Sequence, residues 1–158
     1  MGPGPASRWQ VTRTVGAVTG AFLATRRELF LNHGRFDEAR LPVNYSDVDY
    51  ALKLRASGLK ILCTPQITAY HHESKSRGLD HLDAEKSARH AAERAVMEQR
   101  WGAAMAADPS VNPVWHMATL PFRLLSAPSR SRLWAHIERC AAENPWLPET
   151  VPRPSPRR

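Results

Sequence analysis

The spacing of apolar and polar positions along the chain predicts both strands and helices. Short runs of apolar and small residues, typical of buried strands, cover 15–24, 59–64 and 67–71. Apolar residues at helical spacing, bounded by capping residues, cover 25–32, 46–58, 82–101 and 129–143. The pattern therefore predicts an α/β domain in which a short sheet is flanked by helices.

The helix predicted over 46–58 has the clearest ends. Ser46 can cap its first turn, Asp49 follows three positions later as in a capping box, and Gly58 would stop it. The helix predicted over 129–143 has apolar and small residues on one face: Leu133, Ile137, Cys140 and Ala141.

Length and composition set the number of domains. A chain of 158 residues with 42% hydrophobic content can form one modest core. We expect a flexible leader over 1–10, one domain over 11–105, a helical and loop extension over 106–150, and a disordered tail over 151–158. Nine of the thirteen prolines lie from Pro109 onward, so the extension and the tail are rich in proline.

The chain is basic, with a formal net charge of +7. Such a surface fits the phosphates of nucleic acid, anionic lipid or a nucleotide sugar, and charge alone does not choose among them. A dedicated nucleic-acid arm would carry a denser basic run, whereas residues 1–108 mix 15 basic with 12 acidic side chains. We therefore expect no nucleic-acid partner.

The cysteines and the apolar runs indicate the cellular compartment in which the protein works. Cys63 and Cys140 lie far apart without a Cys-x-x-Cys pair, which argues against a disulfide framework and fits a reducing compartment. The longest mostly apolar stretch, 16–24, is shorter than the ~20 residues that cross a bilayer, and no secretion signal is visible. We expect a cytoplasmic protein without a transmembrane segment, able to work at the cytoplasmic face of the inner membrane.

A series of short motifs from about Gly20 to Gly78 carries the candidate chemistry. In chain order they are Thr19-Gly20, Arg26-Arg27-Glu28, Gly34-Arg35-Phe36-Asp37-Glu38, Ser46-Asp47-Val48-Asp49, Gly58, Pro65 and Tyr70-His71-His72-Glu73-Ser74. Their order and spacing resemble the second half of family 2 glycosyltransferases of the GT-A fold, over about residues 11–105. The stretch Arg100-Trp101-Gly102 and the residues after it resemble the continuation seen in bacterial enzymes that build O-antigen and related polysaccharides.

The resemblance implies an inverting glycosyl transfer in which Asp47 is the catalytic base. A sugar hydroxyl must lose its proton as it attacks the anomeric carbon, and a carboxylate at the start of a helix can accept that proton. From the residues alone capping is the favoured role, since Ser46, Asp47 and Asp49 can all cap the helix. The resemblance makes Asp47 the base, leaves capping as the favoured role of Asp49, and implies Thr19, Gly20, Ser46 and Asp49 as substrate contacts.

The leaving diphosphate needs compensation for its charge. The resemblance implies a divalent metal, Mn²⁺ or Mg²⁺, held mainly by an Asp-x-Asp motif in the family's first half, with His71 as a further ligand. The alternative is that His71 and His72 are ordinary strand-end residues. Ser74, Lys75 and Arg77 form a hydroxyl-rich, basic loop that would contact the diphosphate or, equally, be only solvated.

The chain also departs from the family's pattern. Arg35 stands where the family has a glycine, so we expect a strained loop there, and Ser46 replaces an acidic residue. No Asp-x-Asp and no nucleotide-binding region precede residue 11, and a complete domain needs roughly twice the residues of 11–105. We therefore expect the isolated chain to be incomplete and inactive, and to associate with the missing half or with itself.

The sequence thus predicts a partial GT-A fold with a short mixed sheet and a helical, proline-rich extension. The implied function is the acceptor-side half of an inverting, metal-dependent glycosyltransferase. Its partners would be a nucleotide-sugar donor and a saccharide or lipid-linked saccharide acceptor. The alternative function is a non-catalytic, truncated remnant that binds a glycan or a protein.

Overall fold

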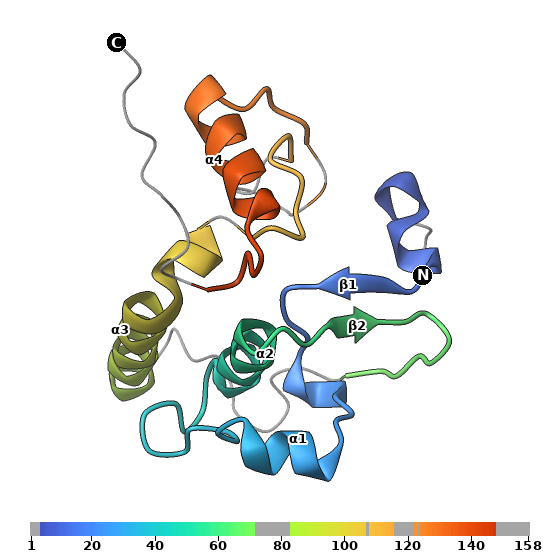
Figure 1. Ribbon diagram of the computed structural model, residues 1–158. Coiled ribbons are helices and arrows are strands. Elements are labelled where there is room, and N and C mark those ends of the chain that lie inside the picture. The colour runs from blue at the N-terminus through green and yellow to red at the C-terminus, as the bar shows by residue number, and fades with distance from the viewer. Residues whose placement is uncertain (1–3, 72–82, 107, 116–121, 123, 148–158) are drawn as a thin grey trace.

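The chain combines helices with a small sheet (Figure 1). The computed structural model describes residues 4–71, 83–106, 108–115, 122 and 124–147. Within these residues β1 (Arg13–Val15) pairs antiparallel with β2 (Ile61–Cys63), and Val15 lies opposite Ile61. The helices are α1 (Arg27–Asn32), α2 (Ser46–Ala56), α3 (Ala84–Ala106) and α4 (Arg130–Ala141), with 3₁₀ helices η1 (Pro5–Gln10) and η2 (Gly20–Phe22).

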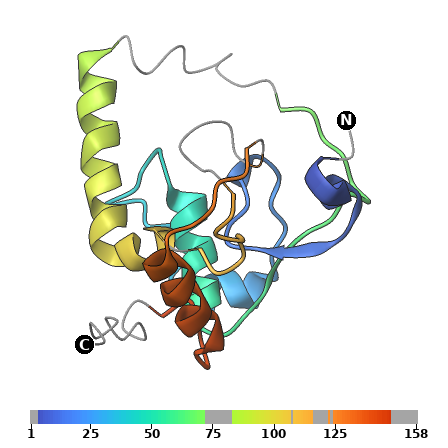
Figure 2. The same ribbon diagram turned by 90° about the horizontal axis from the view of Figure 1, so that it is seen from above.

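Helix α2 is the centre of the packing. It lies between the two-stranded sheet and α3 in both Figure 1 and Figure 2. One face packs Tyr50, Ala51 and Leu54 against the two strands through Val15 and Ile61. The other face packs Leu52 against three residues from other parts of the chain: Leu41, Met97 and Trp146. Burial on two sides explains why apolar residues surround this helix rather than forming one stripe.

Three aromatic rings fix α1 and the loop after it onto α2. The rings of Phe30, Phe36 and Tyr50 meet edge to face, with centroids 5.2 to 5.7 Å apart. The Tyr50 hydroxyl lies 2.9 Å from Thr25 Oγ1, so the buried polar end of this side chain has a partner. Residues 36–45 form a loop without helix or strand, and the packing of Phe36 holds its beginning.

The strand predicted over 15–24 is wrong beyond Val15. The chain leaves the sheet at Gly16, where a Cβ atom would lie 2.6 Å from Asp108 Oδ2 and 3.1 Å from the Trp146 ring. This close approach, which a glycine permits, turns the segment away from the strand direction before η2 begins. The two strands are antiparallel, which differs from the mixed sheet expected from the sequence.

Two further boundaries differ from the predictions. The segment 67–71 forms no strand, and the side chains of Ile67 and Tyr70 are exposed, without a neighbouring strand in the described part of the chain. Helix α3 continues through Gly102 to Ala106, beyond the predicted end at residue 101. The predictions of helices over 25–32, 46–58 and 129–143 are confirmed to within three residues at each end.

Truncation of Met97 tests the contact between α2 and α3. Met97 is fully buried, so Met97→Ala should lower the free energy of unfolding by about 2–5 kcal/mol in urea titrations followed by circular dichroism. Met105→Ala on the same helix is the control, since Met105 is 43% exposed. Equal losses in the two variants would contradict this packing.

Candidate functional site

The first turn of α2 presents the candidate base. The helix begins at Ser46 after Tyr45, which has a left-handed backbone with φ 62° and makes no side-chain cap. The predicted capping box of Ser46 and Asp49 is therefore wrong, because Ser46 already lies inside the helix and Asp49 points into the core. The structure therefore gives Ser46 and Asp49 no capping role.

Asp47 is half-buried and fixed by two backbone N–H groups. Gly20 N–H donates to Asp47 Oδ2, with the nitrogen 2.6 Å from the oxygen, and Val48 N–H donates to Oδ1 at 2.8 Å. A Cβ added to Gly20 would lie 3.3 Å from the Asp47 Cβ, so a glycine allows this close approach. The structure therefore brings Asp47 and Gly20 together, with the exposed Thr19 beside them.

Thr19 shapes the turn that delivers the Gly20 N–H group. Its hydroxyl accepts a hydrogen bond from Ala21 N–H at 3.3 Å and so caps η2. Residues 19–22 are exposed, and Ser46 is half-buried next to Asp47 in the chain. Thr19, Gly20 and Ser46 therefore lie where a ligand approaching Asp47 could reach them.

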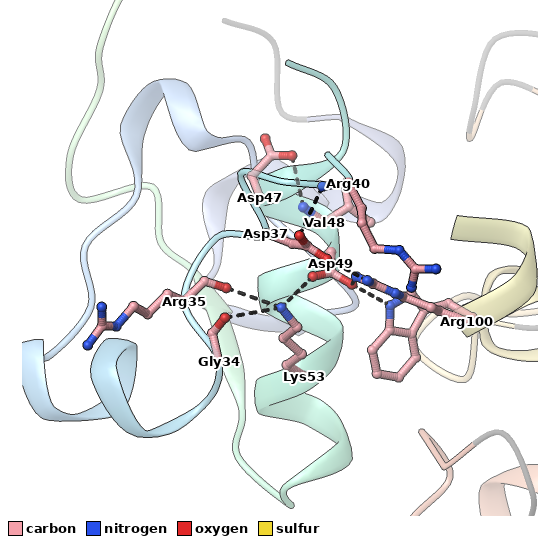
Figure 3. A network of polar contacts seen from close by, with 10 residues as sticks. Gly34, Arg35, Asp37, Arg40, Asp47, Val48, Asp49, Lys53 and Arg100 are labelled. Atoms are coloured by element: carbon pink, nitrogen blue, oxygen red, sulfur yellow. Dashed lines mark hydrogen bonds and ion pairs between the residues drawn. The ribbon is translucent and has the colours of Figure 1, made fainter. Parts of the chain in front are cut away.

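Asp49 has a structural environment that the sequence did not predict. Its side chain is fully buried, with Oδ2 2.6 Å from Lys53 Nζ and Oδ1 3.1 Å from Arg100 Nη1 (Figure 3). Trp101 Nε1 also donates to Oδ1, at 2.9 Å. The prediction that Asp49 contacts substrate is corrected, because these residues occupy both of its oxygens and leave no exposed surface.

Arg100 extends this polar network to the loop before α2. Its guanidinium also pairs with Asp37, whose other oxygen accepts a hydrogen bond from Arg40 N–H at 3.0 Å. The hydrogen bond from Arg100 holds the pKa of Asp37 below its usual value. Burial acts to lower the pKa of Arg100, but its bonds to Asp37 and Asp49 outweigh burial and raise it. Both groups therefore stay charged at neutral pH.

Lys53 fixes the turn at Gly34 and Arg35. Its Nζ donates to the Gly34 and Arg35 carbonyl oxygens at 3.3 and 3.2 Å, as Figure 3 shows. Gly34 and Arg35 both have positive φ, 82° and 51°. The strain expected at Arg35 is thus present, since a side chain disfavours this region by about 1–2 kcal/mol.

Two contacts with α3 anchor the end of the same loop. Asn44 N–H donates to the buried Glu93 at 2.5 Å, and the Tyr45 hydroxyl lies 2.9 Å from His90 Nε2. With the Arg100 contacts, these bonds hold the loop at both ends, so the start of α2 has a fixed position. The sequence offered one signal for this network: Asp49 and Lys53 have the i,i+4 spacing of a helical ion pair.

Of the remaining predicted site residues, the structure describes His71. His71 is exposed, and the described residues contain no group of three or more His, Cys, Asp or Glu able to hold a metal ion. Ser74, Lys75 and Arg77, with His72, lie outside the described residues. A pocket of about 350 Å³ lies beside the other end of α2, and its lining residues are Thr14, Arg55, Pro109, Ser110, Cys140, Pro145 and Trp146. Asp47 is not among them.

Neutralising Asp49 tests the network. Asp49→Asn should lower the free energy of unfolding by about 2–3 kcal/mol, because it leaves Lys53 and Arg100 without their shared counter-charge. The loss stays below that of a fully buried pair, since those two side chains are 23% and 22% exposed. Glu98→Gln, which breaks the exposed Arg94 pair on α3, should cost less than about 1 kcal/mol. Similar values for both variants would show that burial of Asp49 does not matter.

Acid should remove the stabilisation that the Asp37 carboxylate gives to the folded chain. Because the pKa of Asp37 is lower in the folded chain than its ordinary 3.8, its stabilisation is complete above that pH and disappears as the pH falls through the folded value. Urea midpoints of the wild type and Asp37→Asn should therefore differ near neutral pH and converge in acid. Glu38→Gln serves as the control at an exposed neighbour. A constant gap between wild type and Asp37→Asn at every pH would contradict the Arg100–Asp37 contact.

In the described part of the chain, no helix has the length and apolar character needed to cross a bilayer. No family model and no solved structure matches the chain.

Two curated proteins are similar to parts of the chain. The uncharacterized protein y4gI of Sinorhizobium fredii is 43% identical over 107 residues, which is 67% of this chain and 12% of that protein. The O-antigen biosynthesis protein RfbC of Myxococcus xanthus is 45% identical over 76 residues, which is 48% of this chain and 6% of that protein. The chain therefore spans only a small share of the length of either relative.

Proposed function

We propose that the chain is the acceptor-side part of an inverting glycosyltransferase that acts in polysaccharide biosynthesis, with Asp47 as catalytic base. The observation that carries the proposal is the half-buried Asp47 carboxylate, held by the Gly20 and Val48 N–H groups at the start of α2. The similarity to part of a protein named for O-antigen biosynthesis supports a role in polysaccharide biosynthesis. A partial GT-A fold remains part of the proposal.

The proposed step needs a carboxylate that is oriented and still able to accept a proton. Each carboxylate oxygen has two lone-pair positions, so one donor on each oxygen leaves room for an acceptor hydroxyl. As the hydroxyl oxygen bonds to the anomeric carbon, the bond from that carbon to the diphosphate breaks and Asp47 takes the hydroxyl proton. Thr19, Gly20 and Ser46 are the proposed contacts to the acceptor.

The donor side of the reaction lies mostly outside the described residues. The described residues do not by themselves fit a divalent metal, because they contain no cluster of three or more candidate ligands. We therefore assign no step to a metal and propose His71 only as a single ligand. Contacts from Ser74, Lys75 and Arg77 to the diphosphate remain proposals.

Replacing Asp47 tests the mechanism in the complete gene product. Asp47→Asn should lower kcat by at least about 10²-fold, since the amide cannot accept the proton, while the Kd for the donor nucleotide stays unchanged. The control is Glu28→Gln, which changes an exposed acid on α1. Transfer by Asp47→Asn at the wild-type rate would eliminate Asp47 as the base.

The same assay separates this proposal from the non-catalytic alternative. A complete gene product with an Asp-x-Asp segment and sugar-nucleotide turnover supports the enzyme. A gene product that binds saccharide or protein without any turnover, in the wild type as in Asp47→Asn, supports a binding remnant.

A further inference from the structure

The pocket of about 350 Å³ beside the end of α2 is built from several separate segments of the chain. Its wall combines residues of β1, the last turn of α2, the segment after α3, and the end of α4 with the residues that follow it. Asp47 lies on the first turn of α2, so the pocket and the candidate base are at opposite ends of this helix. A cavity of this volume falls within the range that holds small ligands.

Arg55 places a buried positive charge in this wall. It is only 9% exposed, and its guanidinium carbon lies 4.0 Å from the centroid of the Trp146 ring. Stacking of this kind uses the flat face of the guanidinium and leaves its N–H groups, which lie in the plane, for other partners. Arg55 Nε and Trp146 Nε1 are both buried, and neither has a hydrogen-bond partner in the described part of the chain. Buried N–H groups normally have a partner, so these two donors indicate that the wall is built for an acceptor.

The charges that act around the pocket are mainly positive. The carboxylate of Asp108 is the opposite charge that acts on three arginines: Arg8, Arg55 and Arg139. Burial lowers the pKa of Arg55, and the charge of Asp108 offsets this only in part. Asp108 Oδ1 also accepts hydrogen bonds from the N–H group and the hydroxyl of Ser110, each at 2.7 Å. One carboxylate shared in this way leaves an excess of positive charge, which a negatively charged ligand would offset.

A carboxylate suits these surroundings better than a phosphate. The planar fork of a guanidinium matches a planar carboxylate, which can accept two parallel hydrogen bonds from it. A phosphate carries up to two negative charges at neutral pH, and Asp108 would repel the second one. The half-buried Thr14 adds a hydroxyl donor to the wall, and Pro109 and Pro145 add apolar surface for a carbon skeleton.

We propose that this pocket binds a small organic acid, whose carboxylate pairs with the Arg55 guanidinium and accepts a hydrogen bond from the Thr14 hydroxyl. The carbon skeleton of the acid lies against Pro109 and Pro145. The bound acid would link α4 to α2 and β1, because these elements supply the wall. Asp47 lies at the other end of α2, so the inference is independent of the proposed glycosyl transfer.

Titration calorimetry of the complete gene product with benzoate and benzamide tests the proposal. The two probes have nearly the same shape, and benzamide lacks the charge. Benzoate should bind with a Kd at least about tenfold lower than that of benzamide, because only benzoate forms a charged pair with Arg55. Arg55→Met should remove this difference, since methionine keeps an unbranched side chain against Trp146 without the charge. Arg27→Met, at an exposed position on α1, is the matched control and should bind benzoate as the wild type does.

Alkylation of Cys140 in the wild type gives a second measurement that does not depend on how Arg55→Met folds. Cys140 is exposed and lines the pocket, and partial burial raises the pKa of its thiol, so the thiol adds no negative charge at neutral pH. Benzoate should slow the reaction of Cys140 with N-ethylmaleimide in mildly alkaline buffer, and benzamide at the same concentration should not. Mass spectrometry of the peptide that contains Cys140 measures the rate.

Four results would each overturn the proposal. They are equal binding of benzoate and benzamide, undiminished benzoate binding in Arg55→Met, tighter binding of inorganic phosphate than of benzoate, and an alkylation rate of Cys140 that benzoate leaves unchanged. Failure of the complete gene product to bind benzoate at all would also overturn it, by assigning the pocket to another part of that protein.

Discussion

A carboxylate buried in the packed centre of a small chain needs positive or hydrogen-donating partners where it lies, and Asp49 has three of them. Lys53 comes from the next turn of α2, and Arg100 and Trp101 come from α3. Leaving such a group unpaired would cost several kcal/mol, so α3 can dock on α2 only in the register that brings Arg100 and Trp101 to Asp49. Because Arg100 also binds Asp37, the same requirement fixes the loop that enters α2.

The position of the candidate base follows from that constraint. Asp47 lies two residues before Asp49 on the same rigid turn, so holding Asp49 in place also holds the backbone of Asp47. The Gly20 N–H group then meets a carboxylate whose position is already set. Arg139 of α4 is a second buried charged side chain, and it donates a hydrogen bond to the Pro145 carbonyl oxygen.

Local patterns in the sequence predicted the helices well and their environment poorly. Periodicity and Gly58 placed α2 correctly, and the motif around Asp47 identified a side chain that the structure leaves half-buried beside Gly20. The role of Asp49 could not be read locally, because its burial depends on Arg100, about fifty residues later. The strand prediction failed for the same reason: directly after β1 the backbone of Gly16 lies close to Asp108 and Trp146, where a side chain would not fit, and both residues are distant in the chain. Spacing along a sequence does not contain these tertiary contacts.

The most direct test of the central claim is hydrogen exchange at the Gly20 amide, followed by NMR in the wild type and in Arg100→Met. If the buried charges around Asp49 set the position of Asp47, the Gly20 amide should be protected in the wild type. It should exchange at least about tenfold faster in Arg100→Met, while the Leu54 amide within α2 stays protected. Equal protection of Gly20 in the two proteins would contradict the account, because the Asp47 contact would then form without the network.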